Sequence, residues 1–157
     1  MPDETLTREE IETTIREYFE ACNAGDVEEI ASFFAADAVH YFPPGMYEGP
    51  FEGGQTIGER WAKAVDELGS VWTVDRITAD PENATAVMEW THFKTDEERI
   101  LRGDEWYDFD PETGLIEEIR AYYAAPEDPD LDRNELGGFD YAARGYPVES
   151  PLDRDGG

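Results

Sequence analysis

The chain has few positive charges, few cysteines and no long apolar run. Its 157 residues include 39 Asp and Glu but only 12 Lys and Arg, which gives a formal net charge of −27. Each phosphate contact needs a cation, so nucleic acid is a poor partner. Cys22 is the only cysteine, which excludes an intrachain disulfide. Because no apolar run approaches about 18 residues, we expect no membrane-spanning helix and no membrane partner.

Lysine is especially scarce, since only Lys63 and Lys94 occur. An acidic, lysine-poor surface is typical of proteins in a high-salt cytoplasm, where about 1 M salt screens charges beyond roughly 3 Å. We interpret the charge as a halophilic adaptation, and an acidic interaction surface is the alternative. The first residues, Met1 to Glu10, lack the apolar stretch of a signal peptide. We therefore expect a cytoplasmic protein.

The composition predicts one folded domain followed by an extension. Apolar residues make up 39% and aromatic residues 13% of the chain, enough for a core without disulfides or a structural metal. We expect the domain at 1–125 and an acidic, Pro- and Gly-rich extension at 126–157. The extension contains Phe139, Tyr141 and Tyr146, an aromatic group expected to dock on the domain or on a second subunit.

Three segments carry the start and stop signals of helices. Each begins at a capping pair, in which Thr or Asp is followed three residues later by Glu. Apolar residues then recur at helical spacing, and the first and third segments stop at Gly25 and Gly69. The second, shorter helix is predicted to carry Phe33 and Phe34 on its apolar face. The capping pairs are Thr7 with Glu10, Asp26 with Glu29, and Thr56 with Glu59.

Strand-like alternation dominates the rest of the domain. The turns between the later strands are short enough for antiparallel hairpins, and Gly45 to Gly54 is expected to be a loop. The order of elements predicts an α+β fold in which three N-terminal helices pack on a strongly curved, antiparallel or mixed sheet. The predicted strands are 39–42, 71–78, 84–93, 100–109 and 115–123.

Three stretches resemble a known superfamily. Tyr18 to Asp26 and Phe33 to Val39 are similar to the opening of nuclear transport factor 2-like proteins, and Gly114 to Tyr123 is similar to their last strand. The ketosteroid isomerase and SnoaL-like branches are the most similar. The resemblance implies a cone-shaped fold that encloses a small hydrophobic molecule, and it specifies activity poorly because the fold serves many functions.

Alternation also predicts which side chains of the 100–109 strand face the core. Leu101, Gly103, Glu105, Tyr107 and Phe109 share one face. Glu105 would then be a carboxyl group among aromatic rings, where burial raises its pKa. A neutral carboxyl can donate a hydrogen bond to a developing oxyanion, as it does in ketosteroid isomerase.

The resemblance implies roles for individual residues. Tyr18 falls where the isomerases carry their oxyanion-binding tyrosine, and Glu105 where they carry the neutral aspartic acid. Their general base falls on Phe42, which cannot carry a proton. His92 is the predicted replacement, because SnoaL-like cyclases use a pocket histidine with an acidic partner, here Glu105 or Asp104. A neutral histidine is poised for proton transfer near pH 7.

Each of these residues also has a structural interpretation. His92 could be satisfied by a backbone or tyrosine partner, Glu105 by a structural hydrogen bond, and Tyr18 by core packing. The other histidine, His40, is interpreted as structural or exposed. The residues of the limonene epoxide hydrolase site would fall on His92, Trp90 and Ala124, so that activity is not expected.

The sequence predicts an enzyme of the isomerase, cyclase or dehydratase type that needs no cofactor and no metal. It would act by proton transfer next to a carbonyl, with His92, Tyr18 and Glu105 as catalytic residues. The alternative is a non-catalytic domain that binds a hydrophobic ligand or dimerises. The resemblance implies a homodimer that pairs through the open sheet face, and Trp106 on the outer strand face is the candidate contact. The predicted pocket lining is Phe42, Trp61, Trp72, Met88, Trp90 and Tyr107.

The charge predicts salt dependence of folding. In molar salt, far-UV circular dichroism should show mixed helix and sheet, and removal of the salt should unfold the chain because the net charge of −27 is then unscreened. A protein that keeps its full spectrum and thermal stability in dilute buffer would contradict the halophilic interpretation.

Overall fold

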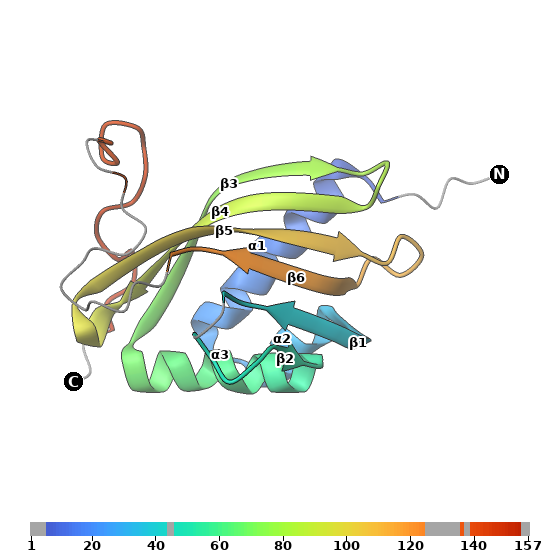
Figure 1. The fold of residues 1–157 in the computed structure, drawn as a ribbon, viewed down its shortest axis with the longest axis horizontal. Helices are drawn as coiled ribbons and strands as arrows, with labels where there is room; N and C mark the ends of the chain where they lie inside the picture. Colours follow the sequence, from blue (N-terminus) through green and yellow to red (C-terminus); the bar gives the residue numbers. More distant parts are fainter. Residues whose placement is uncertain (1–5, 44–45, 125–135, 137–138, 155–157) are drawn as a thin grey trace.

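The computed structural model describes residues 6–43, 46–124, 136 and 139–154 (Figure 1). Two helices, α1 (Arg8–Ala24) and α2 (Val27–Ser32), precede strands β1 (Phe34–Tyr41) and β2 (Phe51–Glu52). Helix α3 (Gly54–Leu68) follows. Four long strands complete the domain: β3 (Ser70–Asp80), β4 (Thr85–Lys94), β5 (Arg99–Phe109) and β6 (Ile116–Tyr122), with the short 3-10 helix η1 (Thr95–Glu97) between β4 and β5.

The strands form one mixed sheet in the order β2-β1-β6-β5-β4-β3. Strands β3 to β6 form the predicted antiparallel meander, whereas β1 pairs in parallel with β6. In Figure 1 the sheet is curved, α1 crosses one face of it diagonally, and α3 lies at the side of β1 and β2. The α+β class with a curved sheet is therefore confirmed.

The N-terminal helix begins and ends as its sequence predicts. Thr7 Oγ1 accepts a hydrogen bond from the backbone N–H of Glu10 at 3.0 Å, and Glu10 Oε1 accepts one from the N–H of Thr7 at 2.9 Å. This reciprocal pair satisfies two N–H groups that the helix leaves unpaired. Gly25 closes the helix with φ of 66°, a left-handed conformation that glycine adopts without strain.

Three boundary predictions are wrong. Phe34 begins β1 and does not lie on a helix face, because it pairs with Ile116 of the distant strand β6. Thr56 does not cap α3, which starts at Gly54 after Gly53 and has no side-chain cap. The expected loop also contains β2, which pairs with Val39 and His40 of β1. The helices thus do not all precede the strands.

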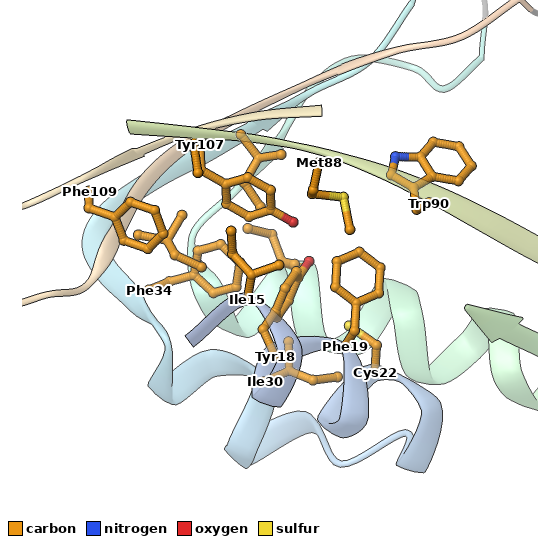
Figure 2. Packing of buried hydrophobic residues seen from close by; sticks show 14 of the residues in the cluster. Ile15, Tyr18, Phe19, Cys22, Ile30, Phe34, Met88, Trp90, Tyr107 and Phe109 are labelled. Carbon is orange, nitrogen blue, oxygen red and sulfur yellow. The ribbon is translucent and has the colours of Figure 1, made fainter. Parts of the chain in front are cut away.

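Buried side chains fill the space between α1 and the concave face of the sheet. Figure 2 shows Ile15, Tyr18 and Phe19 of α1 facing Met88 and Tyr107 of the sheet. Within the described ranges, no helix is both long enough and apolar enough to cross a membrane.

The C-terminal aromatic group docks on the domain, as expected. Tyr146 donates a hydrogen bond from its hydroxyl to Glu89 Oε1 at 2.6 Å. The guanidinium carbon of Arg102 lies 4.1 Å from the centre of the Tyr141 ring. Arg154 donates from Nε to the backbone oxygen of Ser70 at 3.3 Å, near the start of β3. The predicted boundary between 125 and 126 falls outside the described residues.

Candidate functional site

A cavity of about 60 Å³ lies between the helices and the concave face of the sheet. The structure places all three predicted catalytic residues, Tyr18, His92 and Glu105, on its wall. Two of the predicted lining residues, Met88 and Tyr107, are instead buried in the core outside the cavity lining. The other predicted lining residues do line it: Phe42, Trp61, Trp72 and Trp90.

Glu105 is the only acidic residue on this wall among the described residues, and its side chain is buried. Alternation in β5 turns it inward, as predicted. Tyr107 donates its hydroxyl hydrogen to Glu105 Oε2. Burial is the main cause that raises the pKa of Glu105 to about 7. The hydrogen bond from Tyr107 lowers this pKa by a smaller amount, and the charge of Asp104 raises it by a smaller amount. The carboxyl is therefore balanced between its neutral and ionised forms near neutral pH.

The imidazole closest to this carboxyl belongs to His40, which we expected from the sequence to be structural or exposed. His40 Nε2 lies 4.0 Å from Glu105 Oε1, and only 2% of the residue is exposed. Its ring stacks on Phe42 with centroids 4.2 Å apart. Burial lowers the pKa of His40 to about 3, so the ring is neutral. His40 shares the inner face of β1 with buried Ala38, whereas Tyr41 is exposed, and the sequence carries no local signal that chooses between the two faces.

His92 faces the cavity from β4, opposite Leu101 of β5. Its Nε2 lies 2.7 Å from Ser70 Oγ, and its ring stacks on Trp72 at 4.6 Å. Burial, followed by the charge of Lys94, lowers the pKa of His92 to about 3. The ring is neutral, as expected, but the expectation that it is poised for proton transfer near pH 7 is not supported by this pKa.

Tyr18 reaches the cavity from α1, and its hydroxyl oxygen accepts a hydrogen bond from Trp61 Nε1 at 2.9 Å. In Figure 2 the side chains of Tyr18 and Tyr107 extend toward one another with their hydroxyl groups leading. Burial first, and then Cys22 and Glu105, raise the pKa of Tyr18 well above its usual range. The phenol therefore stays protonated and can act as a hydrogen-bond donor.

Asp104, the alternative acidic partner for His92, lies on the other face of β5. It pairs with Glu89 of β4 and lines a surface groove under Tyr146, away from the cavity. Among the described residues, no group of three or more His, Cys, Asp or Glu side chains is arranged to hold a metal ion. The cavity thus combines one titrating carboxyl with two neutral imidazoles and a phenol, a set suited to moving a proton within an apolar enclosure.

Comparison with known proteins identifies the family of the chain and structures with the same fold. The family model described as a SnoaL-like domain matches residues 15–119. A crystal structure of a protein of unknown function with a cystatin-like fold, from Methylobium petroleophilum PM1, is 50% identical. That match covers 95% of this chain and 98% of the other, with a TM-score of 0.76. A search of curated proteins found no match.

Two more distant structures share the fold. One is SalBIII, described as an epoxide hydrolase/cyclase-like enzyme in pyran ring formation in the polyether salinomycin, at 16% identity and a TM-score of 0.60. The other is a proposed polyketide cyclase from Xanthomonas campestris pv. campestris, at 22% identity and a TM-score of 0.59. Each match covers 74% of this chain and 92% of the other.

The raised pKa of Glu105 predicts a stability change with pH. Folding favours the protonated carboxyl, so its contribution is fully present below the usual pKa of 4.5 and is lost as pH rises through about 7. Relative to Glu105→Gln, the wild type should lose roughly 3 kcal/mol of unfolding free energy between pH 4.5 and 8. Denaturant titrations of both proteins across this range, in molar salt, measure the difference.

His40 and His92 are present in both proteins, so their own titration cancels in this comparison. Glu52→Gln, at an exposed position of β2, is the matched control and should follow the wild type. A constant difference between wild type and Glu105→Gln from pH 4.5 to 8 would show that the carboxyl titrates normally.

Proposed function

Because the chain belongs to the SnoaL-like domain family, we propose that it is a cofactor-independent enzyme of the isomerase, cyclase or dehydratase type. The reaction is proton transfer next to a carbonyl group of a small molecule. The observation that carries the proposal is the buried carboxyl of Glu105, which has a pKa of about 7 and lies on the cavity wall beside His40 and Tyr107.

Glu105 is the group best suited to take and return the proton. General acid–base catalysis is most efficient when the pKa of the catalytic group lies near the working pH, and the pKa of Glu105 does. His40 and His92, with pKa values of about 3, are weak bases at neutral pH. In this proposal they act with Tyr18 as neutral partners that orient the substrate and accept or donate hydrogen bonds.

The cavity size supports a small substrate. Sites for drug-sized ligands measure about 300–1,000 Å³, whereas this cavity measures about 60 Å³. A molecule with a single ring fits this enclosure better than a steroid does. The small cavity, lined mainly by aromatic and aliphatic side chains, also favours the second candidate function, a domain that binds a small apolar ligand without turning it over.

Hydrogen exchange at the carbon next to a carbonyl distinguishes an enzyme from a non-catalytic binding domain. The measurement does not require the natural substrate to be known. The enzyme should accelerate exchange of deuterium into the carbon next to the carbonyl of cyclohexanone in D₂O, followed by NMR. Glu105→Gln should reduce the enzymatic rate by about 10²–10⁴-fold, because a positioned acid or base contributes that much. Asp104→Asn, at the adjacent position on the other strand face, should retain the rate.

Variants at the other polar positions assign the remaining roles. His92→Ala tests the sequence-based prediction that His92 is the base, and His40→Ala tests its neighbour. A loss of about 10²-fold or more in one and not the other identifies the partner of Glu105. Tyr18→Phe should slow exchange while keeping the fold. If several small cyclic ketones bind but none exchanges faster than in buffer, the enzyme proposal fails and the binding function stands.

We also propose that the protein is a homodimer that pairs through the outer sheet face. Trp106 is 42% exposed, Tyr41 is 43% exposed and Tyr122 is 54% exposed, and Trp106 and Tyr41 both lie opposite Arg120 of β6. Exposed aromatic side chains of this kind are favoured at protein–protein interfaces.

Trp106→Glu should shift sedimentation at micromolar protein in molar salt from dimer to monomer. Leu152→Glu is the control, because Leu152 is equally exposed at 42% but lies in the C-terminal segment. A wild-type monomer under these conditions contradicts the dimer.

A further inference from the structure

The indole N–H of Trp90 is a buried hydrogen-bond donor without a partner. Only 6% of Trp90 is exposed, and the residue lines the cavity. Among buried side-chain nitrogen and oxygen atoms of the described residues, only Trp90 Nε1 and Thr95 Oγ1 lack a partner. Burial of an unpaired donor opposes folding, so such a group calls for an explanation. Trp61, another tryptophan on the wall, does have a partner, since it donates to Tyr18.

The Trp90 ring packs closely against Gly103 and Tyr123. Gly103 lies opposite Trp90 in the β4–β5 pairing, and a Cβ added at Gly103 would lie 2.8 Å from Trp90 Cζ2 and 2.9 Å from Tyr123 Cβ. Cζ2 is bonded to the carbon that carries Nε1, so the backbone of Gly103 lies close to the N–H edge of the ring, and only glycine leaves room for the indole here. Tyr123 packs edge-on against Trp90 with centroids 5.4 Å apart.

Glu105 is the nearest functional group on the same sheet face. Trp90 pairs with Gly103 and Met88 pairs with Glu105, so Trp90 and Glu105 are diagonal neighbours across the two strands. The indole N–H is directed toward the carboxyl and lowers the pKa of Glu105 as a weak donor would, the smallest of the causes of the shift, but the two groups do not reach the geometry of a full hydrogen bond. In Figure 2 the indole nitrogen lies at the ring edge nearer Met88.

We propose that Trp90 Nε1 donates a hydrogen bond to the carbonyl oxygen of a small uncharged ligand that lies beside the carboxyl of Glu105. The oxygen accepts this hydrogen bond, which satisfies the donor that the protein leaves unpaired. This inference rests on the proposed function only for the step that follows binding, in which negative charge develops on the held oxygen. Trp90 is then an oxygen-binding residue and not simply part of an apolar wall.

The chemistry of the surrounding wall favours an uncharged ligand. Both imidazoles are neutral, and the phenol of Tyr18 stays protonated. A carboxylate placed beside Glu105 would meet a second acidic group in an enclosure that destabilises charge. Lys94 also lines the cavity, and an anionic probe is therefore included in the test.

The test compares cyclohexanone with methylenecyclohexane, which has the same shape but replaces the carbonyl oxygen with CH₂. Protein labelled with ¹⁵N is titrated at pH 6 in molar salt while the tryptophan indole resonances are followed by NMR. The resonance that is missing in Trp90→Phe belongs to Trp90. Cyclohexanone should move this indole proton downfield, and methylenecyclohexane should not. Cyclohexanone should also bind about 2- to 10-fold more tightly, the range for one net hydrogen bond.

Variants provide the matched control. Trp90→Phe should bring the two affinities within about 2-fold of each other, whereas Trp72→Phe, which removes the same atoms from another wall tryptophan, should keep the preference for the ketone. An unmoved Trp90 indole proton at saturating cyclohexanone would overturn the proposal. Tighter binding of cyclohexanecarboxylate than of cyclohexanone would overturn the assignment to uncharged ligands.

This outcome is independent of turnover. If the indole proton shifts but no deuterium exchange occurs, the oxygen site stands and the enzyme proposal fails. If exchange is catalysed and Trp90→Phe changes neither the rate nor the ketone preference, the enzyme proposal stands and the oxygen site fails.

Discussion

The structure of the site depends on the burial of one carboxyl group. An ionised Glu105 in an apolar core would be costly, so the fold surrounds it with partners that tolerate its neutral form. Tyr107 donates to one oxygen and His40 lies beside the other. Desolvation is the largest cause of the raised pKa, and it follows from the packing of α1 against the sheet. The packing that stabilises the domain thus also sets the proton affinity of its central carboxyl.

The pairing of β4 with β5 determines which groups meet in the cavity. One register places His92 opposite Leu101, Trp90 opposite Gly103 and Met88 opposite Glu105. A shift of one residue would turn every one of these side chains to the outer face. The outer positions of the same strands hold Glu89 and Arg102, which contact the C-terminal aromatic group. The inner face of this hairpin thus lines the cavity and its outer face binds the docked segment, and Trp90 borders both the cavity and the groove beneath that segment.

Local sequence patterns were sufficient to predict the antiparallel meander and the inward orientation of Glu105, because side chains alternate along a strand with a fixed period of two. The position of His40 could not be derived in the same way. Its strand is longer than its alternation suggested, contains a register shift after Phe34, and pairs in parallel with the distant strand β6. The start of α3 at Gly54 likewise depends on contact with Ala31 of α2 and not on a capping side chain. Such long-range packing leaves no local signal.

The scarce cations of this acidic chain mainly serve contacts within the molecule. Arg76 and Arg102 lie over Tyr146 and Tyr141, and Arg154 binds backbone oxygens of Ser70 and Asn23. Because guanidinium groups stack on rings and donate several hydrogen bonds, these contacts depend less on long-range charge than a surface ion pair does. Salt that screens the repulsion among the acidic side chains can therefore leave the docked segment in place. Ser70 connects this segment to the cavity, since its hydroxyl lies against His92 while its carbonyl binds Arg154.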